Sequence, residues 1–295
     1  MSNFHKPVLL KEVVDYLSVR KGELYIDGTL GGGGHTRGVI ERGGKVLGID
    51  VDQEALDYVG SELKSEISSS QLTLARGNFK DIDQIAHFNS FDKVAGIIFD
   101  LGVSNYQIDT PGRGFSYLRN GPLDMRMDKD LEVKAGDLIN ILTKGELNEL
   151  FRKLGEEFNA RVISERIVSA RRVKKIETID DLIQAVYGSN RALSPFERAK
   201  RFKKIFQALR IAVNDELNNL KEALPKAIQL LKKDGILAII TFHSLEDRIV
   251  KQAFQEYMED GIGTILTKKP IIPNDSEIEE NSRSKSAKLR VLKKL

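Results

Sequence analysis

The chain has 295 residues, 41% of them hydrophobic and 30% charged, so it can bury a full core as one large or two modest domains. It contains no Cys, which excludes disulfides, Cys–zinc sites and thiol catalysis, and its four scattered His argue against a metal site. The formal net charge of +3 permits a polyanionic partner without requiring one.

The sequence carries no sign of a membrane location. No apolar run approaches the roughly 18–20 residues that span a bilayer. The N-terminal residues also lack the apolar region of a signal peptide. We therefore expect a cytoplasmic protein with no membrane partner.

Runs rich in β-branched residues alternate with helix-like stretches in the first hundred residues. The expected strands are 24–27, 45–50, 72–76 and 94–100, and the expected helices between them are 36–42, 53–64 and 82–88. This alternation predicts an α/β fold with a mostly parallel sheet covered on both faces. Near the C-terminal end we expect a fifth strand at 235–242, a helix at 246–257, and an antiparallel hairpin formed by 264–267 and 289–292.

The long stretch between the fourth and fifth strands has two parts. Residues 101 to about 133 are rich in Gly, Pro, Asp and Arg and predict a long ordered loop, which is usually functional. The following residues look helical, with apolar side chains at Leu147, Leu150, Phe151, Leu154 and Phe158. Capping-box patterns occur at Thr143/Glu146, Thr178/Asp181 and Ser194/Glu197. We predict a main domain of residues 1–133 and 207–295, interrupted by a helical insert of residues 134–206.

The first expected strand runs into D-G-T-L-G-G-G-G-H-T, from Asp27 to Thr36. A turn without Cβ atoms costs entropy on ordering but lets a ligand approach the backbone. Asp50 ends the second expected strand, where an acid in a doubly wound sheet accepts hydrogen bonds from ribose hydroxyls. The two features predict a nucleoside site, and the alternative is a glycine loop that binds nothing.

The spacing of the glycines narrows the choice of nucleoside. No frame has Gly at i, i+2 and i+5, so the dinucleotide fingerprint is absent, as is the P-loop ending. Asp27 would repel a pyrophosphate, but it suits a ligand with a cationic end. S-adenosylmethionine has an ammonium, a sulfonium and no phosphate, so we expect it as the cofactor.

Other candidate residues follow the later strands. Asp100 ends the fourth strand at the ligand crevice and is a candidate proton acceptor or substrate anchor, with a helix cap as the alternative. Phe79 follows the third strand, where it could cover an adenine or equally pack in the core. His243 and Arg248 follow the fifth strand at the rim of the crevice.

Basic residues in the loop and beyond are candidates for binding phosphate. In the loop these are Arg113 and Arg126, although Asp124 could simply pair with them. Three basic clusters occur, at residues 171–175, 198–210 and 283–294. Each one alone is typical of a solvated face, but together they favour RNA or another polyanion.

Nine blocks occur in order along the chain, among them H-K-P-V-L-L-K-E (5–12), the Gly-rich turn, D-L-G-V-S-N-Y-Q-I-D (100–109), G-P-L-D-M-R-M-D (121–128) and F-H-S-L-E-D-R-I-V-K (242–251). Together they resemble the family of bacterial ribosomal RNA small subunit methyltransferase H, the 16S rRNA cytosine-N4 methyltransferases. The resemblance implies a class I, Rossmann-like methyltransferase domain with an insert that recognises rRNA. It also implies S-adenosyl-L-methionine as cofactor and, as target, the exocyclic N4 of one cytosine in the P-site region of 16S rRNA within the small ribosomal subunit.

The resemblance also assigns residues. The family's cofactor positions carry over to Gly33, Gly34, His35, Asp50, Phe79, Asp100 and Gln107, whose residue types all match. Asp27 is a further candidate for the cofactor, and Asp100 is the candidate acceptor for the N4 proton. The candidates for binding substrate or RNA are Arg113, Asp124, Arg126, Arg201, Lys203, Lys204, His243 and Arg248. No metal is expected, and the oligomeric state is left open, a homodimer included.

Three blocks depart from the family's pattern. Its usual S-S-P-Q is residues 104–107 here, its G-E-E-R is residues 155–158 and ends in Phe158, and its P-A-T-R-T is residues 201–205. These departures lie in the loop and the insert, so they bear on RNA contact and exact target more than on the cofactor. Two alternatives stay open, a methyltransferase for DNA cytosine or another amine, and an RNA-binding ribosome-assembly factor. An inactive paralogue would be expected to lose Asp50 or Asp100.

Overall fold

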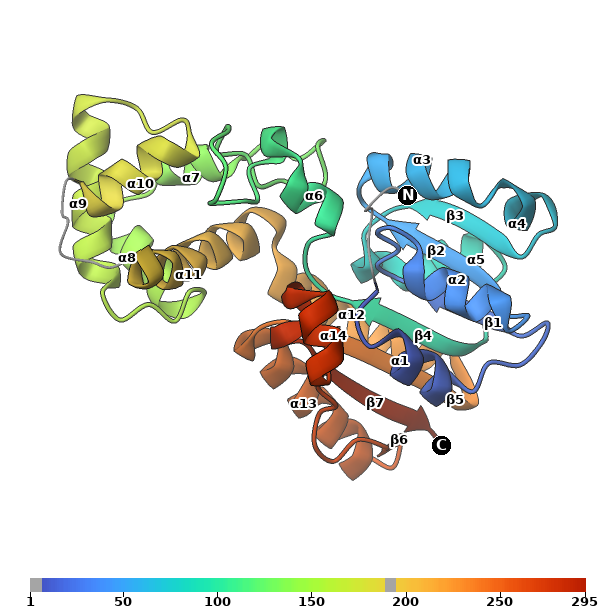
Figure 1. Ribbon diagram of the computed structural model, residues 1–295. Helices are drawn as coiled ribbons and strands as arrows, with labels where there is room; N and C mark the ends of the chain where they lie inside the picture. The colour runs from blue at the N-terminus through green and yellow to red at the C-terminus, as the bar shows by residue number, and fades with distance from the viewer. Residues whose placement is uncertain (1–6, 189–194) are drawn as a thin grey trace. The chain divides into compact units, whose positions relative to one another are not determined.

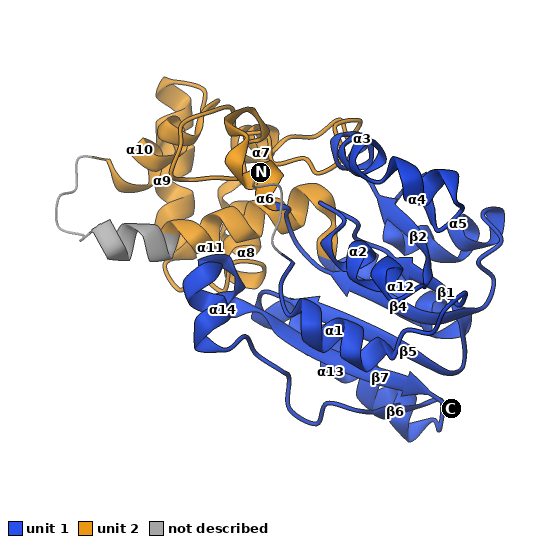
Figure 2. Ribbon diagram, turned by 45° about the vertical axis from the view of Figure 1, so that its right-hand side comes forward, with its two compact units in different colours: residues 1–104, 217–295 blue, residues 105–216 orange. Residues whose placement is uncertain are grey.

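The computed structural model describes residues 7–188 and 195–295 and divides the chain into two compact units (Figures 1 and 2). Unit 1 contains residues 1–104 and 217–295, and unit 2 contains residues 105–216. Each unit has a core of its own. Among the described residues, no helix is both long enough and apolar enough to cross a membrane.

Unit 1 is built on a single seven-stranded sheet. Its strands are β1 (Leu24–Asp27), β2 (Lys45–Asp50), β3 (Leu72–Arg76), β4 (Val94–Asp100), β5 (Leu231–Thr241), β6 (Gly263–Ile265) and β7 (Lys288–Lys294). They lie in the order β3-β2-β1-β4-β5-β7-β6. The first five are parallel, and β7 runs antiparallel to both β5 and β6. The predicted Rossmann-like sheet with an antiparallel C-terminal pair is confirmed.

Helices cover both faces of this sheet, as the sequence predicts. The helices of unit 1 are α1 (Leu10–Leu17), α2 (Gly34–Glu41), α3 (Gln53–Glu62), α4 (Lys64–Ser68), α5 (Ile82–Phe88), α12 (Glu216–Leu230), α13 (Ser244–Glu259) and α14 (Asp275–Glu280), with 3-10 turns η1 (Phe79–Asp81) and η3 (Ser282–Ser286). Alternate strand residues point to opposite faces. Tyr25 and Ile98 belong to the core that holds α1, α2 and α3, whereas Ile26 and Phe99 belong to the core that holds α5, α12 and α13.

The strand order places the topological switch point of the sheet beside β1. The chain passes from β1 to β2 and β3 on one side, and then crosses over to β4 on the other side. In an open parallel sheet, ligands bind outside the carboxyl ends of the strands at such a switch point. The carboxyl ends of β1, β2 and β4 are Asp27, Asp50 and Asp100.

Unit 2 is helical apart from one long irregular segment. Its helices are α6 (Asn105–Asp109), α7 (Ala135–Ile141), α8 (Lys144–Lys153), α9 (Ala160–Val173), α10 (Ile179–Tyr187) and α11 (Pro195–Asn214), with the 3-10 turn η2 (Pro111–Arg113). The capping boxes at Thr143/Glu146 and Thr178/Asp181 are confirmed. The third predicted box begins at Ser194, which lies outside the described residues.

Unit 2 begins and ends at different residues from the predicted insert, 134–206. Leu123 and Met125, in the loop expected to belong to the main domain, are buried in the core of unit 2. Leu209, expected in the main domain after 207, is buried there too. The loop and α11 therefore belong to the helical unit, because their apolar side chains pack in its core.

The predicted apolar stripe of α8 is wrong at its end. Leu147 and Phe151 are fully buried, but Phe158 is 95% exposed. The helix stops at Lys153, and Gly155 follows, where a Cβ atom would lie only 2.7 Å from the carbonyl oxygen of Lys204. The i, i+4 spacing of the apolar residues thus continues beyond Lys153, where the helix ends.

Candidate active site

The Gly-rich turn of unit 1 is held by the acid that opens it. The Asp27 carboxylate, 1% exposed, accepts a hydrogen bond from the Thr36 hydroxyl (Oδ2 to Oγ1, 2.8 Å) and another from the backbone N–H of Thr29 (3.3 Å). Burial raises the pKa of Asp27, and the neighbouring His35 and these hydrogen bonds oppose that rise. Asp27 thus ties both ends of the turn together and holds an acid at its base.

Two positions in the turn require glycine. A Cβ atom on Gly28 would lie 2.4 Å from a ring carbon of Phe99, so any side chain would displace that ring. Gly33 has φ +73°, a left-handed conformation that L side chains rarely adopt, and it precedes the first turn of α2. The glycines therefore keep the backbone of the turn in close contact with the strands and bare of side chains.

Asp50 lies at the tip of β2, facing the turn. Its Oδ2 accepts a hydrogen bond from the backbone N–H of Gly31 (2.8 Å), and its Oδ1 accepts one from the backbone N–H of Asp52 (2.9 Å). Burial raises the pKa of Asp50 to about 6, and the two hydrogen bonds only partly oppose it. The carboxylate has neutral donors around it and no salt bridge to a described residue, so lone pairs stay available for hydroxyl donors.

Asp100 lies at the tip of β4, on the other side of β1 from Asp50. Its backbone N–H donates to the Thr29 hydroxyl (2.6 Å), which joins the end of β4 to the turn. Its Oδ2 lies 3.7 Å from Nδ1 of His35. Nε2 of His35 donates to the carbonyl oxygen of Val8 (3.0 Å), because a carbonyl can only accept. His35, 4% exposed, is therefore hydrogen-bonded to the N-terminal segment and lies beside Asp100.

Phe79 forms one wall of the same edge of the sheet. It begins η1 directly after β3, and its ring lies 5.3 Å from that of Phe99, tilted by 46°. The ring is half-buried and packs on the core that holds α5, α12 and α13. Packing in the core, one of the two predicted alternatives, is therefore confirmed for part of the ring, and covering of an adenine stays a prediction.

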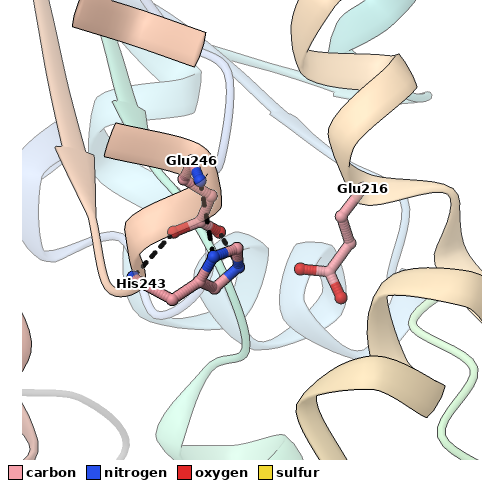
Figure 3. Close-up of side chains that lie close together, drawn as sticks. All are labelled: Glu216, His243 and Glu246. Atoms are coloured by element: carbon pink, nitrogen blue, oxygen red, sulfur yellow. Dashed lines mark hydrogen bonds and ion pairs between the residues drawn. The ribbon is translucent and has the colours of Figure 1, made fainter. Parts of the chain in front are cut away.

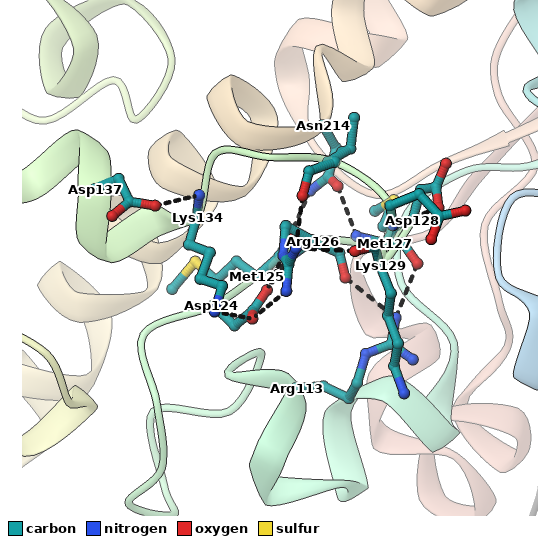
Figure 4. Close-up of polar contacts among 12 residues, drawn as sticks. Arg113, Asp124, Met125, Arg126, Met127, Asp128, Lys129, Lys134, Asp137 and Asn214 are labelled. Carbon is teal, nitrogen blue, oxygen red and sulfur yellow. Dashed lines mark hydrogen bonds and ion pairs between the residues drawn. The ribbon is translucent and has the colours of Figure 1, made fainter.

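The predicted loop residues of unit 2 hold the loop together (Figure 4). Arg126 forms a two-pronged pair with Asp124 (Nε to Oδ1, 2.7 Å; Nη2 to Oδ2, 2.9 Å). Arg113, 5% exposed, donates to the backbone carbonyls of Arg126 and Met127 (3.1 and 2.8 Å). Although burial alone would raise the pKa of Asp124, hydrogen bonds from Arg126 lower it. Arg113, Asp124 and Arg126 thus form hydrogen bonds within the loop itself.

The end of α11 fastens the same loop. The side chain of Asn214 accepts from the backbone N–H of Met127 (2.7 Å) and donates to the carbonyl of Met125 (2.8 Å) (Figure 4). Two residues on, Glu216 accepts two hydrogen bonds from Arg210 (2.8 and 2.9 Å). Gln107, predicted to contact the cofactor, is buried on α6 of this unit.

His243 caps α13 in unit 1 (Figure 3). Its Nδ1 accepts from the backbone N–H of Glu246, while the carboxylate of Glu246 accepts from the backbone N–H groups of Phe242 and His243 (2.8 and 3.3 Å). The cap accounts for Nδ1 of His243, whereas Nε2 lies 3.1 Å from Oε1 of Glu246; a contact with substrate stays a prediction. Arg248, one turn further along α13, is exposed.

The basic candidates on α11 differ from one another. Lys203 is exposed. Lys204 donates to the backbone carbonyl of Glu156 (2.7 Å) and lies over the ring of Phe158. The side chain of Arg201 lies outside the described part of the chain.

Sequence reasoning missed the residues that support the site. Thr29, Thr36 and Val8 orient Asp100, Asp27 and His35, and Asn214 closes the loop of unit 2. Their only signal is that each lies inside or beside a block that resembles the methyltransferase family. A hydroxyl or a backbone carbonyl that hydrogen-bonds to a site residue does not occur at a fixed sequence distance from it, so no motif predicts it.

The residues at the carboxyl edge of the sheet fit S-adenosylmethionine. The glycine backbone is bare because Phe99, Val59 and the Pro7 ring occupy the space that side chains would need. Three carboxylates, those of Asp27, Asp50 and Asp100, lie at the ends of adjacent strands. Carboxylates accept hydrogen bonds from ribose hydroxyls and attract a cationic amino-acid end. A phosphate-bearing cofactor would meet three carboxylates there.

Comparison with known proteins shows the family of the chain. The MraW methylase family matches residues 2–295. The ribosomal RNA small subunit methyltransferase H of Persephonella marina is 45% identical over 295 residues, covering 99% of each chain. The protein of the same name from Fusobacterium nucleatum is 43% identical over 314 residues, covering 100% of this chain and 98% of that one. That of Sulfurihydrogenibium azorense is 43% identical over 293 residues, covering 99% of each.

Proposed function

Since the chain belongs to the MraW methylase family, we propose that it methylates the exocyclic N4 of a cytosine in the P-site, or decoding, region of 16S rRNA, with S-adenosyl-L-methionine as donor. The names of the relatives, ribosomal RNA small subunit methyltransferase H, support rRNA of the small subunit as the substrate class. The observation that carries the proposal is the arrangement of Asp50 and Asp100 at strand tips on the two sides of the Gly-rich turn.

The cofactor is held by the edge that runs from β3 to β1. Asp50 accepts hydrogen bonds from the ribose hydroxyls, and Phe79 covers the adenine. Gly33 and Gly34 allow close approach, and Asp27 places negative charge near the cationic amino-acid end. When bound, the cofactor supplies a methyl group made electrophilic by its sulfonium charge.

Asp100 acts on the other reactant. The N4 lone pair of cytosine is delocalised into the ring, so the amine is a poor nucleophile. A carboxylate oxygen of Asp100 that accepts an N4–H hydrogen bond raises electron density on nitrogen and aims the lone pair. The hydrogen bond from its backbone N–H to the Thr29 hydroxyl holds Asp100 in place, so that orientation supplies most of the acceleration. A base within an RNA helix must be splayed out to reach this position.

Unit 2 serves as the rRNA-recognition domain in this proposal. Lys203 is exposed on α11, and the positive charge of such side chains supplies affinity for phosphates. The substrate is 16S rRNA within the small ribosomal subunit, and the reaction therefore takes place in the cytoplasm.

The proposal is tested by incubating unmodified small subunits with isotope-labelled donor, digesting the rRNA, and identifying the labelled nucleoside by mass spectrometry. We expect N4-methylated cytidine at one position, and free cytidine should be inert. Label on C5 of cytosine, on a ribose, or on no rRNA nucleoside would refute the proposal. RNA binding without any transfer would instead favour an assembly factor.

A further inference from the structure

We propose that the ring of Phe158 is a stacking platform for an unpaired base of the RNA. It lies between α8 and α9 in unit 2 and is 95% exposed. The identity of the RNA rests on the proposed function, whereas the platform itself rests on the geometry of unit 2. A single exposed apolar side chain is ordinary on a protein surface. What sets Phe158 apart is how its backbone is held and which side chains surround its ring.

The backbone that carries Phe158 is firmly held. Gly155 packs so closely on α11 that a Cβ atom would lie 2.7 Å from the carbonyl oxygen of Lys204. The next carbonyl, that of Glu156, accepts a hydrogen bond from the ammonium of Lys204 (2.7 Å). The Glu157 side chain is 4% exposed and accepts from the backbone N–H of Asn159 (2.8 Å). The residues before and after Phe158 are thus anchored in their backbone, and its ring projects into solvent.

A cation accompanies the ring. Nζ of Lys204 lies 5.2 Å from the centroid of Phe158, within the range of a cation–π contact. Its hydrogen bond to Glu156 keeps the ammonium there. A base that stacks on the exposed part of the ring therefore finds a positive charge beside it for its phosphate. An aromatic ring flanked by fixed positive charge is the arrangement that binds single-stranded nucleic acid without regard to sequence.

Further basic residues occur on the helices that flank Phe158 in the sequence and on α11, and an exposed acid, Glu156, is close to Phe158 in the sequence. Arg152 lies in the last turn of α8, Arg161 lies in the first turn of α9, and Lys203 precedes Lys204 on α11. All three are exposed, and none forms a salt bridge with a residue that the structure describes. An apolar protein partner would need a wider apolar patch, whereas a single ring with a cation held beside it matches one unpaired nucleotide.

Unit 1 offers a matched control. Phe88, at the end of α5, is 89% exposed, and no cation–π contact joins it to any described residue. The test compares the full-length protein with Phe158→Ala, Phe158→Leu, Phe158→Trp and Phe88→Ala. Each is titrated into a single-stranded RNA that carries one 2-aminopurine, and into the same RNA annealed to its complement. Affinity is read from anisotropy at several salt concentrations, and stacking is read from quenching of the 2-aminopurine.

We expect Phe158→Ala to bind the single strand about fivefold to 100-fold more weakly, the range for removal of one stacked base. Its quenching should fall while its salt dependence stays unchanged, since no phosphate contact is removed. Phe158→Trp should bind and quench like the parent, Phe158→Leu should resemble Phe158→Ala, and Phe88→Ala should have no effect. Duplex binding should not change in any variant.

Parental affinity in Phe158→Ala would overturn the inference, as would full retention in Phe158→Leu or equal losses on duplex and single strand. These outcomes are independent of methyl transfer, because no donor is present. If small subunits are still methylated when Phe158→Ala binds normally, only the platform is refuted. If the parent methylates no rRNA yet loses single-strand binding in Phe158→Ala, the platform stands and the proposed function falls.

Discussion

Carboxylates in the two units differ in their hydrogen-bond partners and in the direction of their pKa shifts. In unit 1, burial raises the pKa of Asp27 and of Asp50, whose hydrogen-bond partners are backbone N–H groups and a hydroxyl. In unit 2, the pKa of Asp124 is lowered despite burial, because the guanidinium and the backbone N–H of Arg126 donate hydrogen bonds to it. A buried acid with neutral donors keeps affinity for a ligand, whereas an acid paired with a guanidinium has its charge already compensated.

This difference separates two kinds of substitution. Changes at the strand tips of unit 1 should alter binding or catalysis while the fold remains stable. Changes in the braced loop of unit 2 should alter stability and leave the cofactor affinity of unit 1 unaffected.

The largest effect is expected at Asp100. Asp100→Asn keeps the shape of the side chain but weakens its acceptor, so kcat should fall about 10²- to 10⁴-fold, the range for one positioned acid–base group. Cofactor affinity should change far less. Single-turnover rates at saturating donor, together with titration calorimetry, measure both quantities. Equal losses in rate and affinity would make Asp100 a binding residue instead.

Removing a brace of the loop should destabilise unit 2. Asp124→Ala leaves Arg126 without its carboxylate partner and should cost about 2–3 kcal/mol of unfolding free energy, the upper part of the range for hydrogen bonds to charged groups. Glu132→Ala, at an exposed residue of the same loop, is the control and should stay within about 0.5 kcal/mol. Urea unfolding measures both variants.

The pH dependence of this destabilisation has a defined sign. The pKa of Asp124 lies below its usual value of 3.8, so its contribution is present above that pH and is lost as the pH falls through the lower, folded-state pKa. The difference in unfolding free energy between the parent and Asp124→Ala should therefore shrink below pH 3.8. A constant difference would mean that the variant loses packing rather than the ion pair.

At the tip of β2, the expected effect is on the cofactor alone. Asp50→Ala should weaken S-adenosylmethionine binding by about 1.5–3 kcal/mol, the value for hydrogen bonds to a charged acceptor. Asp57→Ala, at an exposed acid of α3, should bind normally. Titration calorimetry that finds unchanged affinity in Asp50→Ala would remove Asp50 from the site.

The smallest effects are expected on the surface of α11. If Lys203 and Lys204 bind phosphates, replacing either with Gln should flatten the salt dependence of RNA binding by up to ~0.7–0.9 log units for each phosphate that is no longer neutralised. Lys45→Gln, at the opposite end of β2 in unit 1, serves as the control. An unchanged slope in the α11 variants would mean that these lysines form a solvated helix face.

The sequence predicted the sheet better than the unit boundaries. Four strand ranges, 24–27, 45–50, 72–76 and 94–100, agree with β1 to β4, because apolar runs bounded by acids and glycines define them locally. The assignment of the loop failed because composition does not reveal that Leu123 packs into the helical unit. The prediction that Phe158 continues the apolar face of α8 failed for a similar reason, because helical spacing alone does not show that the helix ends at Lys153, before Gly155.

The candidate site divides in the same way. Asp27, Asp50 and Asp100 follow from their positions at strand ends, since parallel topology brings such residues to one edge. His35 came only from family resemblance, because its role depends on the carbonyl of Val8, which no motif describes. The partners of Arg113 and Arg126 also could not be predicted, since a loop's internal contacts depend on its fold.

The most direct test of the difference between the units is the pH dependence of cofactor binding. The pKa of Asp50 is raised to about 6, and the ionised form accepts the ribose hydroxyls. Calorimetric affinity for S-adenosylmethionine should therefore be constant above about pH 7 and fall about tenfold per pH unit below about pH 6. Asp50→Asn should bind weakly with no such dependence between about pH 5 and pH 7. An affinity of the parent protein that does not change over this range, or an equal pH dependence in Asp50→Asn, would contradict the role assigned to Asp50.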